Sequence, residues 1–560
     1  MARPQLPRAA ARAGRTLHAL HALLALLTLL PPSGWATVPA RLPGAAQAPC
    51  AAGAGDACRP APAQAQEQEP AWLADGQALA RSALGLLAGA ADDGLDPAHY
   101  GLDALARRMP QIDGPDAAAQ FERDLGAAMR AFVTDLHGGR IPPSRRARYA
   151  DPAPFDAARH LAAAAGEGRL AQAVRDAAPA IPPYERVRAS LRHYRELARR
   201  APGPFALPPV AASGLAPGAR YDGAAQLRER LLLLGDLPPG AEASAHDADR
   251  YTEALAQALR RFQMRHGLAP DGVLGPATLE ALAVPLDHRV DQLALTLERL
   301  RWLPRLPDGP AVVVNLPAYR LWAFDRGGSA APLEMRIIVG KAAGTPTPQF
   351  LGQMRHVEFN PYWNVPRSIL MGEIMPRIAR DPAYLRDNDM EALGPSGTAA
   401  PASGGALLAG LRSGALRLRQ RPGPRNVLGA VKFALPNPMN IYLHGTATPA
   451  LFGRARRDLS HGCIRVEDPV GLAHFVLDAA PAWRAGGVEA AIAGGRNLVV
   501  PLPAPVPVIL FYATAMIDRH GRVLFADDIY RRDPGLIDLL KAPPRAGAAH
   551  AVGLRWRPPA

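Results

Sequence analysis

Apolar residues recur every three to four positions over the stretch that follows residue 70, a spacing that predicts amphipathic helices. One such run stops at Gly138-Gly139; it consists of Phe121, Leu125, Met129, Phe132 and Leu136. Another helix is predicted to begin near Pro183 and to continue through Leu191 and Leu197. We therefore expect a helical domain over residues 70–205.

A second helical unit is predicted over residues 222–285. Two short apolar faces indicate its first helices; they are Leu227, Leu231 and Leu234, then Leu255, Leu259 and Phe262. Turn residues follow at Gly267 and Gly272, and Gly275-Pro276 starts a further helix with proline at its first position.

From about Ala311 the apolar period changes to two, which is typical of strands. Strands are predicted around residues 312–316, 321–323 and 336–339, with a helix over 468–479 and a late strand from Pro507. Helical pieces alternate with Gly/Ser/Ala-rich ones over 369–416, which indicates an insertion. The expected fold is multidomain α+β: the helical domain, the small three-helix unit, a β-rich domain over 311–490 containing the insertion, a strand segment over 500–540 that packs on it, and a tail over 541–560.

The N-terminal residues have the pattern of a secretory signal peptide. Arginines without acidic residues precede the apolar run Ala19–Leu30, and Pro31-Pro32 ends it. We expect residues 1–36 to be removed on export, with an uncleaved N-terminal membrane anchor as the alternative, and residues 37–68, rich in Pro and Ala, to form a disordered linker. Outside the cytoplasm Cys50 and Cys58 can pair as a disulfide; two free thiols are the other interpretation.

The formal net charge of +14 changes this picture little. Almost all of the 64 basic residues are arginines spread along the chain, and no dense basic run is interleaved with aromatic residues. We therefore expect no nucleic-acid partner, whereas a basic surface would suit an anionic polymer of the cell envelope.

The candidate chemistry centres on Cys463, the third of only three cysteines. It lies in Ser460-His461-Gly462-Cys463-Ile464-Arg465, downstream of Tyr442-Leu443-His444-Gly445-Thr446. A lone thiol with histidines nearby is a candidate nucleophile, because an imidazole is the usual means of removing the thiol proton. A buried structural cysteine in a glycine turn is the alternative.

We assign roles around this thiol as hypotheses. His444 is the preferred proton donor and acceptor, because a strand can hold its ring across from the cysteine loop; His461 is the rival, or it orients the loop. The backbone N–H groups of Gly462 and Cys463 are candidate oxyanion donors. Arg465 can bind a substrate carboxylate or lower the thiol pKa, unless it pairs with Glu467 or Asp468. No ligand spacing suggests a metal site, and no cofactor is expected.

These two motifs together resemble the catalytic signature of the L,D-transpeptidases, which have a YkuD-type catalytic domain. Phe262–Leu268 and Asp271–Thr278 resemble the small three-helix peptidoglycan-binding domain, and residues 70–205 resemble the helical scaffold domain of the large multidomain members from Gram-negative bacteria. Phe359–Pro366 resembles the strand and turn that line the family's cleft, and the insertion over 369–416 resembles its cap. The resemblance implies substrate-binding roles for a further set of residues: Arg465, Ser460, Tyr442, Asn360 and Trp363.

The resemblance also implies a substrate and a place. The donor would be a peptidoglycan tetrapeptide stem that loses its terminal D-Ala, and the acceptor the side-chain amine of another stem, which gives a 3→3 cross-link through a cysteine acyl-enzyme. Water as acceptor would make the protein an L,D-carboxypeptidase; ligation of a lipoprotein to the wall and a non-catalytic wall-binding scaffold are further alternatives. The expected location is the periplasm, with other wall-synthesis enzymes as candidate partners and carbapenems as the expected inhibitors.

Overall fold

The computed structural model describes residues 70–543 apart from 148, 150–153, 241–246, 329–330, 401–403 and 485. The predicted signal peptide, the linker, the Cys50–Cys58 pair and most of the predicted tail lie outside these residues. Within the described ranges, none of the helices combines the length and the apolar character needed to span a membrane.

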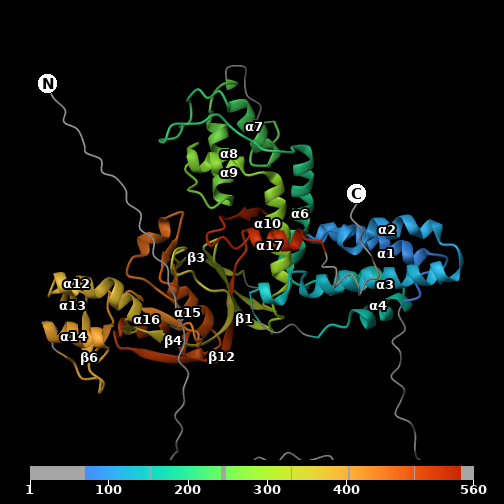
Figure 1. Ribbon diagram of the computed structural model, residues 1–560. Helices are drawn as coiled ribbons and strands as arrows, with labels where there is room; N and C mark the ends of the chain where they lie inside the picture. Colours follow the sequence, from blue (N-terminus) through green and yellow to red (C-terminus); the bar gives the residue numbers. More distant parts are fainter. Residues whose placement is uncertain are drawn as a thin grey trace, which may run out of the picture. The chain divides into compact units, whose positions relative to one another are not determined.

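The N-terminal part is a helical domain, as predicted (Figure 1). Its helices are α1 (Ala78–Ala88), α2 (Leu102–Arg108), α3 (Gly114–Gly138), α4 (Ala157–Gly166), α5 (Leu170–Ala177) and α6 (Pro182–Arg200). In α3 the predicted apolar residues, from Phe121 to Leu136, are all buried in one core with residues of the other helices. This burial is what holds the helices together.

A buried helix that the sequence analysis missed follows the second unit. α10 (Leu286–Arg301) contacts α6 and is buried over most of its length. Its charged residues break the apolar pattern, and two of them pair inside the protein: Arg301 Nη1 bonds Glu298 Oε2 at 3.1 Å, and both side chains are fully buried. Glu298 also accepts a hydrogen bond from the backbone N–H of Ile141, just after α3, at 2.8 Å.

The second unit consists of α7 (Ala224–Leu233), α8 (Glu253–Arg265) and α9 (Pro276–Ala283) around a separate core. The predicted turn before α9 is held by the buried amide of Gln263. Its Oε1 accepts from the N–H of Gly272 at 2.9 Å, and its Nε2 donates to Thr278 Oγ1 at 3.1 Å. Each polar atom of this buried side chain therefore has a partner.

The third part is a nine-stranded sheet in the order β10-β3-β11-β9-β8-β4-β12-β1-β2. The strands are β1 (Gly309–Asn315), β2 (Arg320–Arg326), β3 (Leu333–Gly340), β4 (Phe350–Phe359), β8 (Val431–Ala434), β9 (Leu443–His444), β10 (Asp458–Ser460), β11 (Ile464–Val466) and β12 (Leu498–Phe511). Because β2 also pairs with β3, the sheet closes on itself. α15 (Pro469–Leu477) buries its apolar face against the same core.

The late strand differs from the prediction. β12 begins at Leu498 rather than at Pro507, and it lies inside the sheet between β4 and β1 instead of packing on it. The pairing with β4 shifts register between Pro501 and Val506, where proline cannot donate to the ladder. β13 (Ala515–Ile517), β14 (Val523–Phe525) and α17 (Pro534–Lys541) follow.

The predicted insertion is a separate small layer with its own apolar core, which we call the cap. It contains α11 (Arg367–Ile369), a π-helical turn (Leu370–Ile374), α12 (Met375–Arg380), α13 (Tyr384–Asp387) and α14 (Gly405–Ser413). It also contains a small sheet that was not predicted, in the order β5 (Trp363–Asn364), β7 (Arg417–Gln420) and β6 (Met390–Leu393). Figure 1 shows α12, α13, α14 and β6 gathered together.

Candidate active site

Two short parallel strands place the candidate side chains on one face of the sheet. β11 pairs with β9 so that Arg465 lies opposite His444. Since side chains two residues apart along a strand share a face, Tyr442 and Cys463 lie on that face as well. Cys463 is thus the neighbour of Tyr442 and lies diagonally across from His444.

The Cys463 thiol is half-buried beside Tyr442. Its Sγ lies 3.5 Å from the backbone oxygen of Asn440, to which the thiol donates. Burial raises the pKa of the thiol, whereas the N–H and the hydroxyl of Tyr442, and the charges of Lys432 and Arg465, oppose that rise.

His444 is more deeply buried than Cys463, with 5% of its surface exposed. Burial, and after it the charge of Arg465, lowers the pKa of His444 to about 3. The backbone carbonyls of Gly445 and Leu428 act in the opposite direction, but Nδ1 forms no hydrogen bond among the described residues. At neutral pH the ring is therefore neutral and able to accept a proton.

The resting pair at neutral pH is a protonated thiol with a neutral imidazole. A Cys463 thiolate preformed beside a charged His444 would be disfavoured by the burial of both groups. The arrangement suits a general-base step, in which His444 takes the proton as the sulfur attacks.

The turn before Cys463 is stabilised by the hydroxyl group of Ser460, which belongs to the turn. Ser460 Oγ donates to the carbonyl of Cys463 at 2.6 Å and accepts from the N–H of Gly462 at 3.2 Å. Ser460 is buried, so we assign it to the loop and not to substrate, which corrects the prediction. The Gly462 N–H, predicted as an oxyanion donor, is likewise engaged within the loop. In the part of the chain that the structure describes, the Cys463 N–H has no hydrogen-bond partner, so it is the better candidate donor.

A second clamp holds this turn from the segment after β3. Thr347 Oγ1 donates to the carbonyl of Gly462 at 2.7 Å and accepts from the N–H of Gly340 at 2.8 Å. The Tyr530 hydroxyl donates to the carbonyl of Gly340 at 2.7 Å. Neither Thr347 nor Tyr530 was predicted from the sequence, because the stretch around Thr347 carries only turn signals and Tyr530 lies far along the chain.

His461 contacts the cap. Its Nε2 lies 2.6 Å from Glu373 Oε1, and both side chains are about one-third exposed. Glu373 belongs to the π-helical turn that precedes Pro376. Proline lacks the N–H that an α-helix needs at this point, and such turns often occur at functional sites. Nothing local in the sequence marks Glu373.

Arg465 has no ion pair among the described residues. The alternatives considered for it are wrong: Glu467 pairs with Arg336, and Asp468 accepts from the N–H of Gly471 at the start of α15. Arg465 Nη1 lies 3.5 Å from Thr448 Oγ1, and its buried Nε has no partner. A fixed positive charge without a carboxylate thus lies beside the sulfur.

Asn360 and Trp363 lie elsewhere than predicted. The Asn360 side-chain amide donates to the carbonyls of Ala491 and Ile492, at 2.9 and 3.1 Å, and so stabilises the segment around α16 (Gly487–Ala493). Trp363 is buried in the core of the cap, against which Tyr442 packs. Neither side chain is free to contact substrate, so we correct both assignments.

The described residues include no group of three or more His, Cys, Asp or Glu side chains placed to hold a metal ion.

Comparison with known protein families gives three matches along the chain. Residues 309–485 match the L,D-transpeptidase catalytic domain of the YkuD family, residues 64–191 match a scaffold domain, and residues 220–282 match a domain described as "Putative peptidoglycan binding domain".

A curated protein of Haemophilus influenzae, named "Putative L,D-transpeptidase", is 32% identical over 242 residues, which is 43% of this chain. The matched region spans about half of that relative, namely 48% of its length.

Two solved structures also match. An L,D-transpeptidase from Xylanimonas cellulosilytica is 17% identical over 54% of this chain and 100% of its own, with a TM-score of 0.17. One from Stackebrandtia nassauensis is 12% identical over 54% and 97%, with a TM-score of 0.20. Scores this low carry no inference about the site.

Proposed function

The chain carries an L,D-transpeptidase catalytic domain together with a peptidoglycan-binding domain, and from this premise we propose that it exchanges amide bonds in peptidoglycan through an acyl-enzyme on Cys463. The observation that carries the proposal is the placement of Cys463, His444 and Arg465 on one sheet face. That face brings together a thiol, a neutral base and a cation that forms no ion pair with any described residue.

In the first half-reaction the sulfur attacks the carbonyl that precedes the terminal D-Ala of a tetrapeptide stem. The thiol proton passes to His444, and the negative charge that develops on the carbonyl oxygen is stabilised by the Cys463 N–H. The C–N bond then breaks, the proton moves from His444 to the leaving amine, and a thioester to Cys463 remains.

In the second half-reaction an amine of another stem attacks the thioester. His444 takes the proton of that amine, and the thiol leaves with a proton returned from His444. We propose that the acceptor is the side-chain amine of the third residue, which gives a 3→3 cross-link. No external energy source is needed, since one amide replaces another.

Two further side chains on this face are assigned to substrate. Arg465 can form a charge-assisted hydrogen bond with a stem carboxylate, because it has no ion pair among the described residues. Tyr442 lies beside the sulfur, with the cap core packed against it, and so can line the path of the donor stem.

Mass spectrometry of purified disaccharide-tetrapeptide incubated with the protein tests the proposal. A dimer that has lost one D-Ala supports 3→3 cross-linking, whereas a tripeptide product alone identifies an L,D-carboxypeptidase. A product that appears only when a lipoprotein is added identifies a lipoprotein ligase. An unchanged substrate, together with no carbapenem adduct on Cys463, would leave only the wall-binding scaffold.

We propose that the enzyme works outside the cytoplasm, where its substrate is, and that residues 220–282 hold it on the wall. N-terminal sequencing of the native protein distinguishes a cleaved signal peptide from a retained anchor. Co-sedimentation of the protein with purified sacculi, with and without this domain, tests wall binding; equal sedimentation would assign the domain to a spacer role.

A further inference from the structure

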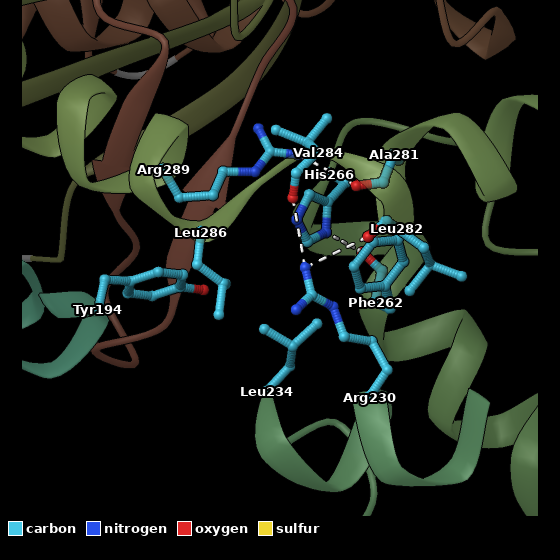
Figure 2. A pocket seen from close by; sticks show the side chains of 10 residues that line it. All are labelled: Tyr194, Arg230, Leu234, Phe262, His266, Ala281, Leu282, Val284, Leu286 and Arg289. Atoms are coloured by element: carbon cyan, nitrogen blue, oxygen red, sulfur yellow. Dashed lines mark hydrogen bonds between the residues drawn. The ribbon is translucent and has the colours of Figure 1, made fainter. Parts of the chain in front are cut away.

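A small cavity lies where the second helical unit meets α6 and α10 (Figure 2). The link between α9 and α10, with Val284, forms one side of it. The centre of a water molecule can occupy a volume of about 10 Å³ inside the cavity. The cavity can therefore hold one water or one small ion. It is lined by Tyr194, Arg230, Leu234, Phe262, His266, Ala281, Leu282, Val284, Leu286 and Arg289.

Two arginines reach this cavity from different units. Arg230 belongs to α7 and Arg289 to α10, and only 6% and 8% of their surfaces are exposed. Neither has a carboxylate within ion-pair distance among the described residues, whereas the neighbouring Arg265 pairs with Asp236. Two buried positive charges thus line the same cavity, and neither forms an ion pair among the described residues.

The arginines have polar contacts, but these are neutral. Arg230 Nη2 donates to the carbonyls of Leu282 and Val284, both at 3.3 Å. Arg289 donates to the carbonyl of Ala281 at 3.3 Å and to Gln292 Oε1 at 2.8 Å. Each guanidinium also lies over an aromatic ring, that of Phe205 for Arg230 and that of Phe525 for Arg289. Carbonyls at the end of a helix carry partial negative charge, which offsets the guanidinium charges only in part. Within the described part of the chain, the buried Nε of Arg230 has no hydrogen-bond partner.

The electrostatics of the cavity agree with an excess of positive charge. Burial, together with the charges of Arg265 and Arg230, outweighs the opposing effects of Tyr194 and Asp527 and lowers the pKa of Arg289 to about 10. Burial and the charges of all three arginines hold the pKa of His266 well below its usual range, so that this ring is neutral. An unpaired charge inside a protein is costly, and a small ion of opposite sign removes that cost.

We propose that this cavity binds a small monovalent anion, of the size and charge of chloride, between Arg230 and Arg289. The Tyr194 hydroxyl accepts from Arg265 Nη1 at 3.0 Å, so its own proton is free to be donated to the ion. Larger anions such as sulfate or gluconate exceed the space. Because its two cations come from α7 and α10, the ion ties the peptidoglycan-binding domain to the rest of the chain.

Thermal unfolding of the full chain at constant ionic strength tests this site, with sodium gluconate replaced stepwise by sodium chloride. For the wild type we expect a saturable rise in Tm of about 3 °C or more, as for any ligand that binds only the folded state. Arg230→Gln and Arg289→Gln should each abolish the saturable rise. Arg199→Gln, which removes an exposed charge from α6, should keep it.

A direct measurement keeps the proposal testable if those variants do not fold. Crystals of the wild type grown with bromide in place of chloride should show an anomalous peak between Arg230 and Arg289. The absence of this peak, the absence of a chloride-specific rise in the wild type, or a rise that survives Arg230→Gln would each overturn the proposal.

Discussion

The two histidines beside Cys463 lie in regions that hold them in different ways. His444 stands on a strand inside the closed sheet, is almost fully buried and has a pKa lowered to about 3. His461 stands at the edge of the cap, is partly exposed, and bonds a single side chain there, Glu373. The sheet fixes one histidine through backbone pairing, whereas the cap meets the other through one contact between side chains.

This difference separates two tasks. A general base must keep its position and stay neutral, and burial in a paired strand provides both. A contact between partly exposed side chains contributes little to stability, so breaking it costs little free energy. We therefore assign chemistry to the sheet side and access to the cap side, and the variants below are chosen to break that division.

The largest effect is expected for the nucleophile. Cys463→Ala removes the only cysteine on the sheet face, so cross-linked dimer should fall below detection in the mass-spectrometric assay. The matched control is the double variant Cys50→Ser/Cys58→Ser, which changes cysteines distant in sequence from the motif and should keep most of the activity. An active Cys463→Ala protein would contradict the mechanism.

The base should come next. His444→Ala should slow acylation of Cys463 by a carbapenem by about 10²–10⁴, the usual range for lost general-base help. Stopped-flow fluorescence gives the rate, and intact mass confirms a single adduct. His461→Ala should lose much less; if it is the more damaging of the two, the roles of the histidines are reversed.

Thr347 tests how the sheet side holds the catalytic turn. Thr347→Val keeps the side-chain volume but leaves the buried N–H of Gly340 and the carbonyl of Gly462 without their partner. We expect a loss of about 2–4 kcal/mol in the free energy of unfolding, measured by urea denaturation. Thr345→Val is the control: its hydroxyl makes one bond, to the Ser460 carbonyl at 3.2 Å, and is less buried, so its loss should be smaller.

What the sequence predicts well is local. His444 was predicted on a strand across from the cysteine loop, and the structure has His444 in β9, paired with the strand β11 that begins directly after Cys463. The predictions failed where a polar side chain bonds the protein's own backbone. Ser460 and Asn360 have side chains of the type that binds substrate, but they donate hydrogen bonds to backbone carbonyls. Only the folded arrangement distinguishes these two uses.

Long-range partners were beyond a single sequence. Helix α10 was not predicted because its buried charged residues break the apolar pattern, and some of their partners come from other parts of the chain, as when the backbone N–H of Ile141 donates to Glu298. The start of β12 was missed because its prolines argue against a central strand, which the register shift accommodates. Glu373 lies far from His461 along the chain, so no motif joins them.

Acid sensitivity tests the burial of His444. Its pKa is about 3 in the folded protein but near 6.5 when unfolded, so between these values the unfolded state binds the extra proton. Above about pH 6.5 the titration of His444 does not reduce the free energy of unfolding. Below that pH it lowers the free energy of unfolding, by up to about 1.4 kcal/mol per pH unit. Urea denaturation at pH 7.5 and 5.0 should show a smaller loss for His444→Gln than for the wild type. An equal loss would mean that other groups, such as the buried His266, account for it.

The smallest effect is expected at the cap contact, and it is the sharpest test of the comparison. Glu373→Gln keeps the shape of the side chain and a hydrogen-bond acceptor but removes the charge that meets His461. An exposed pair of this kind contributes about 0.2–1 kcal/mol, so acylation at low carbapenem concentration should slow by no more than about fivefold. If the cap governs access, the change should appear in the concentration that gives half-maximal rate and not in the maximal rate.

Glu489→Gln is the matched control, because Glu489 bonds His474 in a similar exposed pair at 2.7 Å that involves neither the cap nor the catalytic loop. A Glu373→Gln variant that lowers the maximal rate as far as His444→Ala does would place His461 in the chemistry. One that behaves like Glu489→Gln in both parameters would show that the contact does not govern access.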